Sequence, residues 1–265
     1  MHAAGIFPFT ENYRFGQKRL CFIAARHVAD PASATHRLID ARFAEFEPEA
    51  VVLEGLSPLG PVWDAESEAH YVDKAQQRMA QQPPWIPEQL YALLRAKGAG
   101  TRVFSGEPSD ALQAAHLLAC GYTAEDYFYF DFLLSIDHWK LRKLPDTELY
   151  ALWDRHSEGQ ATLATSGQRF LFADFERWFG NISSATFGLE KMDGSFIAPD
   201  ADAKFGTLRH IASALSHFRD RNCLAVIEDA VNAHDRVLVV YGGSHFFTLK
   251  PALEEQLGQP VPAAR

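Results

Sequence analysis

The sequence RVLVVYGGSH occupies residues 236–245 and contains the clearest strand pattern in this chain of 265 residues. Residues 237–241 are all apolar, and a short apolar run without alternation is typical of a strand that is buried on both faces of a sheet. Two glycines end the run and place His245 just beyond it. Strands covered on both faces occur mainly in parallel sheets with helical crossovers, so this stretch indicates an α/β fold.

We predict strands in three earlier short stretches, residues 19–25, 50–53 and 101–105, of which the first two are almost continuously apolar. A helix is expected after the first of them, with Asp30 as its N-cap, Pro31 in its first turn and its end near Phe46. This alternation of strand and helix predicts a mostly parallel central sheet flanked by helices.

The middle of the chain is aromatic-rich and helical in pattern, and no flexible linker borders it. We therefore expect one α/β domain over residues 1–265, with a helical insertion or cap inside it. The expected ranges are about 19–120 and 206–258 for the core, 121–205 for the insertion, and 146–157 and 167–179 for helices within the insertion.

Composition limits the function classes. The net charge is −9 and no run of Lys and Arg stands out, which argues against a nucleic-acid partner. No apolar run is long enough to span a bilayer. The cysteines Cys21, Cys120 and Cys223 are far apart and form no C-x-x-C pair, so we expect neither a disulfide framework nor a thiolate zinc site. This cysteine usage fits a cytoplasmic protein; the pattern leaves the oligomeric state open.

Ligand sites of open α/β sheets lie beyond the carboxyl ends of the strands, so the residues that follow each predicted strand are the site candidates. They bring two imidazoles and two carboxylates toward one edge. The candidates are Arg26 and His27 after the first strand, Glu54 after the second, Glu107 after the third, and Gly242, Gly243, Ser244 and His245 after the last.

Two imidazoles with a carboxylate suit a divalent transition metal, or a general base with an orienting acid. Each residue also has a structural interpretation: His27 as a hydrogen-bonded loop histidine, and Glu54 as a salt-bridging carboxylate. For Glu107 the structural interpretation is favoured, because a carboxylate near a helix amino terminus is stabilised by the helix dipole. Ser244 lies outside any G-x-S-x-G elbow and is expected to hydrogen-bond within its loop.

Four segments together resemble a known superfamily. Residues 24–27 (AARH) resemble its first G-x-x-H motif, with Ala in place of Gly, and residues 52–54 (VLE) resemble the Glu after its second strand. Residues 218–221 (FRDR) resemble its late E-R-D-R segment, and residues 239–245 (VVYGGSH) match its second G-x-x-H motif. The superfamily groups the TraB/PrgY proteins, TIKI-type metalloproteases, erythromycin esterases and ChaN-like haem-binding proteins.

The resemblance implies a hydrolase that activates water for attack on an ester or amide, in a small-molecule or peptide substrate. We expect the reaction to be metal-assisted, with His27, Glu54 and His245 as ligands of Mn, Co, Zn or Fe. In a metal-free version these residues are catalytic, and His27 or Glu54 is the general base. In both versions Arg219 or Arg221 stabilises the oxyanion. Arg26, Glu107, Gly242, Gly243 and Ser244 are the expected substrate contacts. The alternatives are a protein that binds haem, iron or a small anion, and a non-catalytic regulator.

Overall fold

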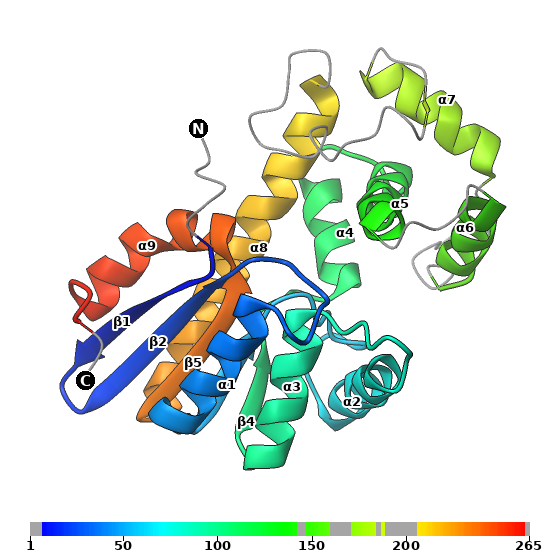
Figure 1. The fold of residues 1–265 in the computed structure, drawn as a ribbon. Coiled ribbons are helices and arrows are strands. Elements are labelled where there is room, and N and C mark those ends of the chain that lie inside the picture. The colour runs from blue at the N-terminus through cyan, green and yellow to red at the C-terminus, as the bar shows by residue number, and fades with distance from the viewer. Residues whose placement is uncertain (1–6, 142–146, 160–170, 184–186, 189–205, 263–265) are drawn as a thin grey trace. The chain divides into compact units, whose positions relative to one another are not determined.

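The computed structural model describes residues 7–141, 147–159, 171–183, 187–188 and 206–262. The fold is mixed α/β with a five-stranded, mostly parallel sheet, as predicted (Figure 1). Its strand order is β1-β2-β5-β3-β4, and only the β1–β2 pair is antiparallel. The strands are β1 (Phe9–Phe15), β2 (Lys18–Ala25), β3 (Ala50–Leu53), β4 (Arg102–Ser105) and β5 (Arg236–Gly242).

Helices connect the parallel strands and form most of the middle of the chain. Their bounds are α1 (Ala34–Phe46), α2 (Ala65–Met79), α3 (Glu88–Ala99), α4 (Asp110–Ala119), α5 (Ala124–Leu141), α6 (Thr147–Gly159), α7 (Phe172–Ser183), α8 (Gly206–Ala233) and α9 (Gly243–Leu257). The predicted helix over residues 167–179 overlaps α7, while its first part, residues 167–170, lies outside the described residues.

Both faces of the sheet are covered, which explains the continuous apolar runs of β2, β3 and β5. Alternate residues of each strand point to opposite faces. Phe22 on β2 packs with Val239 on β5 and with α8 and α9. Its neighbour Ile23 packs with Val240 and with α1, α2 and α3 on the other face. The sheet is therefore the middle layer of three.

The structure differs from the predicted elements at the start of the chain. The edge strand β1 was not predicted, because its sequence FTENYRF mixes polar and aromatic residues and lacks a buried run. The first helix begins at Ala34, not at Asp30. Ser33 is its N-cap and accepts a hydrogen bond from the His36 N–H, whereas the Asp30 carboxylate accepts from Ala32 in the preceding turn. Asp favours such local turns as strongly as it favours caps, which explains the error.

Contacts divide the chain into two compact units. The first comprises residues 1–110 and 219–265 and holds the sheet; the second comprises residues 111–218. The second unit has its own aromatic core, in which Phe132, Trp153 and Phe175 pack edge to face or tilted. The suggestion that these helices cap the site stays a prediction.

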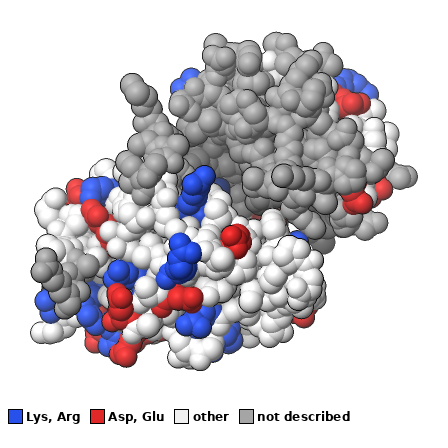
Figure 2. Space-filling model, viewed as in Figure 1, with Lys and Arg blue, Asp and Glu red and all other residues white. Residues whose placement is uncertain are grey.

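The sequence contains no run of Lys and Arg residues, and none of its apolar runs is long enough to span a bilayer. On the face of the first unit in view, Lys and Arg side chains are interspersed with Asp and Glu side chains (Figure 2). Within the described ranges, no helix combines the length and apolarity needed to cross a bilayer. Of the three cysteines, Cys21 and Cys223 are buried and Cys120 is exposed.

Candidate functional site

Parallel pairing brings the ends of β2, β3 and β5 to one edge of the sheet. Ala25 is paired with Gly242, and Leu53 with Val240, so the residues that follow these strands emerge at nearly the same level. His27 lies two residues beyond β2, Glu54 directly follows β3, and His245 lies in the first turn of α9. The structure thus brings together the two histidines and the glutamate.

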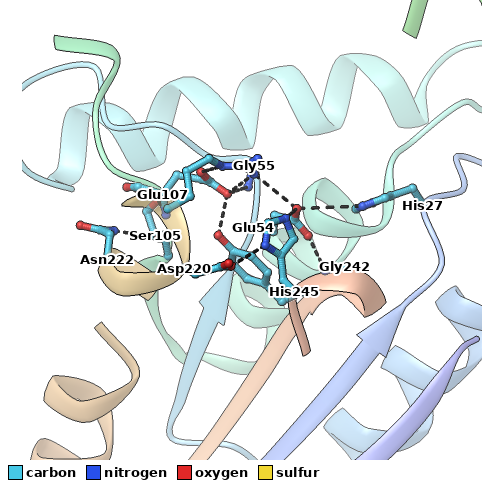
Figure 3. Close-up of polar contacts among 12 residues, drawn as sticks. His27, Glu54, Gly55, Ser105, Glu107, Asp220, Asn222, Gly242 and His245 are labelled. Atoms are coloured by element: carbon cyan, nitrogen blue, oxygen red, sulfur yellow. Dashed lines mark hydrogen bonds and ion pairs between the residues drawn. The ribbon is translucent and has the colours of Figure 1, made fainter. Parts of the chain in front are cut away.

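Glu54 is at the centre of the site (Figure 3). Its Oε1 atom lies 3.5 Å from Nε2 of His245, 4.0 Å from Nε2 of His27 and 3.4 Å from Nη2 of Arg219. Its Oε2 atom accepts a hydrogen bond from the backbone N–H of Gly242. Glu54 is only 8% exposed, so these partners replace the water that a surface carboxylate would have.

Each imidazole also contacts a second carboxylate through its other nitrogen. Nδ1 of His27 lies 2.6 Å from Oε1 of Glu88, and Nδ1 of His245 lies 2.5 Å from Oδ1 of Asp220. Both carboxylates are buried. A carboxylate accepts a hydrogen bond from Nδ1 only when that nitrogen carries a proton. With Nδ1 held in this way, the other ring nitrogen of each histidine, Nε2, faces Glu54. The site is therefore an alternating chain of carboxylate, imidazole, carboxylate, imidazole and carboxylate.

The surroundings of His27 favour its charged form. Partial burial opposes protonation, but the hydrogen bond to Glu88 and the charges of Glu54 and Glu88 outweigh it and raise the pKa of His27 to about 9. The side chain is 59% exposed, so it is open to solvent or a ligand, whereas that of His245 is 12% exposed. The two histidines thus differ in both accessibility and surroundings.

Arg219 joins Glu54 to a third buried carboxylate. Its Nε and Nη2 atoms donate to the two carboxylate oxygens of Glu107, at 2.6 and 2.7 Å, and the Tyr241 hydroxyl donates to Glu107 at 2.7 Å. Burial alone would raise the pKa of Glu107, but Arg219, Tyr241 and the Gly55 N–H bring it down to about 2. Glu107 is therefore an ionised, fully paired anion that holds the guanidinium beside Glu54.

Gly242 has a steric reason to be glycine. A Cβ atom at this position would lie 2.7 Å from Nε2 of His27 and 3.0 Å from Oε2 of Glu54. Any other residue would displace the imidazole or the carboxylate. The space beside this glycine is thus filled by the site's own side chains.

The remaining predicted site residues lie in different surroundings. Arg26, Arg221 and Ser244 are exposed. Gly243 is buried, and a Cβ atom there would overlap the ring of Phe7. Glu107 is 4% exposed and paired with Arg219, so it is placed to hold the arginine.

Sequence reasoning assigned no role to Glu88, Asp220 or Tyr241. Glu88 begins α3, and Asp220 stands between the two candidate arginines on α8, so both were near recognised signals. Their distance in sequence from the histidines, 61 residues for Glu88 and 25 for Asp220, hides the pairing. Only the fold brings each carboxylate to an imidazole Nδ1.

Within the described part of the chain, the predicted ligands do not form a metal centre. Among the described residues, no group of three or more His, Cys, Asp or Glu side chains is placed to hold an ion. Oε1 of Glu54, the expected carboxylate ligand, lies 3.4 Å from the Arg219 guanidinium, and this cation would repel a second one. Metal binding stays a prediction, and no step below depends on it.

No protein-family model, curated protein or solved structure matches this chain significantly. The likeness to the TraB and erythromycin esterase superfamily therefore still depends on the four short motifs alone.

The raised pKa of His27 gives a direct prediction. The NMR chemical shift of its ring should titrate with a midpoint near pH 9, well above the usual 6.5. Because the folded state binds this proton more tightly than the unfolded state, the resulting stability is fully present below pH 6.5 and is lost as the pH rises through 9. Glu88→Gln should move the midpoint back toward 6.5, and an unchanged midpoint in that variant would contradict the assigned cause.

Proposed function

We propose that this protein is a hydrolase that activates water at the site formed by His27, Glu54 and His245, for attack on an ester or amide. One observation carries the proposal: each imidazole lies between Glu54 and a second buried carboxylate, with Nε2 directed at Glu54. A carboxylate at Nδ1 fixes the tautomer and ring orientation of a catalytic histidine and stabilises its protonated form. Here the arrangement occurs twice around one carboxylate.

The two histidines support different roles. His27, with its pKa raised to about 9, carries a proton at neutral pH and is the more exposed ring, so we assign it as the acid that protonates the leaving group. His245, held by Asp220, is assigned as the base that takes a proton from water. An acid and a base beside the same carboxylate supply both proton transfers of hydrolysis.

Glu54 serves both rings in this proposal. Its negative charge lies within 4.0 Å of each Nε2 and stabilises the imidazolium that forms at His245 as water is deprotonated. Arg219 is a positioning residue, because its contacts with Glu107 and Glu54 keep the Glu54 carboxylate in place. Pairing with Glu107 also fixes the guanidinium, so Arg219 holds the Glu54 carboxylate without rearrangement during the reaction.

The proposal is tested on the purified full chain with chromogenic esters and anilides of graded size. We expect saturable ester turnover above the buffer rate, and turnover that persists after treatment with a chelator. Metal content and the absorption spectrum after haem addition are measured on the same sample. Absence of turnover together with a Soret band would overturn the hydrolase in favour of a haem-binding protein, and activity restored only by Mn, Co, Zn or Fe would replace the metal-free route.

A further inference from the structure

Tyr241 is a fully buried residue of β5 that contacts two parts of the candidate site at once. Its hydroxyl group donates a hydrogen bond to Oε1 of Glu107, at 2.7 Å. Its ring lies beside the imidazole of His245, with the ring centroids 5.2 Å apart and the two ring planes at 89°. Tyr241 therefore links the carboxylate that holds Arg219 to the histidine that is assigned as the base.

The hydroxyl contact fixes the position of the Tyr241 ring. Burial and the charge of Glu107 raise the pKa of Tyr241 well above its usual value of 10, so the hydroxyl group keeps its proton and remains a donor. A hydrogen bond to an ionised carboxylate is roughly twice as strong as one between neutral groups. Glu107 is itself held by Arg219 and by the Gly55 N–H. The Tyr241 ring is thus anchored by contacts that do not involve His245.

The space for this ring depends on a glycine at position 106. A Cβ atom on Gly106 would lie 2.7 Å from Cε2 of Tyr241 and 3.3 Å from Sγ of Cys223. Non-bonded carbon atoms pack best at about 3.5–4.0 Å, so any larger residue at this position would displace the Tyr241 ring. The Gly106 N–H donates to the carbonyl oxygen of Leu53, which ties this backbone to the end of β3. Gly106 is therefore the residue that makes room for the Tyr241 ring.

The contact with Tyr241 restrains His245 in a direction that its two carboxylate partners resist only weakly. Asp220 contacts Nδ1 and Glu54 lies near Nε2, and both nitrogens direct their protons or lone pairs in the plane of the imidazole. Contacts at both nitrogens still allow the ring to rock about the line that joins them. A perpendicular aromatic ring packed against the imidazole opposes this motion, because the rocking would break a favourable edge-to-face contact.

We propose that Tyr241 is a positioning residue that holds the His245 imidazole in the orientation in which Nε2 faces Glu54. The inference rests on the proposed function, in which His245 takes a proton from water. A base must lie within hydrogen-bond reach of the proton that it removes, and a misplacement of about 1 Å can lower the rate about 100-fold. Substrate binding does not need this orientation, so loss of the Tyr241 ring should lower kcat and leave KM nearly unchanged.

The first test is independent of activity and uses the NMR signals of the His245 ring in the full chain. These signals should be single and sharp in the native protein, and Tyr241→Leu, which removes the ring, should broaden or double them. Tyr241→Phe keeps the ring but loses the hydrogen bond to Glu107, so it should cause a smaller change. Tyr13→Leu is the matched control. Tyr13 is a buried tyrosine of the same hydrophobic core, on the strand β1, which β2 separates from β5.

The second test is kinetic. Tyr241→Leu should lower kcat for ester hydrolysis by about 10- to 100-fold, and Tyr241→Phe should recover most of this loss. Tyr13→Leu should lower the thermal midpoint, because it truncates a buried ring, but it should leave kcat and the His245 signals unchanged.

Single, sharp His245 signals in Tyr241→Leu, or an equal loss of kcat in Tyr13→Leu, would overturn the positioning role. If Tyr241→Leu does not fold, native His245 signals together with native kcat in Tyr241→Phe would overturn it. Failure of the proposed function looks different: a native protein without turnover, whose His245 signals still respond to Tyr241→Leu, would overturn the hydrolase and leave Tyr241 as the residue that orients His245.

Discussion

Glu54→Gln is expected to lower ester turnover by about 100- to 10,000-fold, the range that general acid–base catalysis contributes, because both histidines depend on the Glu54 charge for their proton transfers. The substitution removes the charge within 4.0 Å of both imidazole Nε2 atoms and leaves neither ring with its central counter-ion. Folding should persist, because the Gln amide oxygen can accept the hydrogen bond from Gly242 and Arg219 keeps Glu107 as its partner. Turnover and the thermal midpoint are measured on the same preparations.

Glu49→Gln is the control for this experiment. Glu49 directly precedes β3, whereas Glu54 directly follows it, and Glu49 is paired with Arg236 at the other end of the sheet. Its substitution should leave turnover unchanged. A Glu54→Gln protein with native turnover and a lowered thermal midpoint would show that Glu54 is structural and would remove it from the mechanism.

Arg219→Met should be the most destabilising change, at about 3–5 kcal/mol, because it removes one partner of a buried ion pair. Glu107 is 4% exposed, so without the guanidinium it is left as a buried anion with only the Tyr241 hydroxyl and a backbone N–H. Combining Arg219→Met with Glu107→Leu should recover much of the loss. The free energies of unfolding are measured by urea denaturation. Arg95→Met is the control: it breaks a half-exposed ion pair with Asp40 and should lower stability by only about 0–1 kcal/mol.

The pH dependence of stability gives a second readout for Arg219→Met. In the native protein the pKa of Glu107 is lowered to about 2, so its pairing contributes stability above the usual value of 4.5 and loses it as the pH falls toward 2. In the variant, burial is no longer outweighed by Arg219, so protonation of Glu107 should stabilise the folded state. The variant should therefore become more stable as the pH falls from 7 toward 5. A variant with native stability at pH 7 would show that the pair is dispensable.

The sequence predicted the sheet well where hydrophobic burial alone determines local structure. The apolar runs that became β2, β3 and β5 were recognisable because both faces of these strands are buried. The strand β1 was missed because its sequence FTENYRF mixes polar and aromatic residues and carries no continuous apolar signal. The helix start at Ser33 was missed because Asp30 and Ser33 are both good N-caps, and packing decides between them.

For the site, too, part of the arrangement was predictable from the sequence and part was not. The sequence by itself determined which residues follow the strands, and parallel topology then required His27, Glu54 and His245 to meet at one edge. Only the tertiary structure decided that Glu88 and Asp220 bind the imidazoles, that Glu107 holds Arg219, and that β1 carries Phe7 to Gly243. The positions of the buried strands along the chain follow from local hydrophobic patterns. These pairings instead join side chains far apart in sequence, and their geometry is set by how helices and the edge strand pack on the finished sheet.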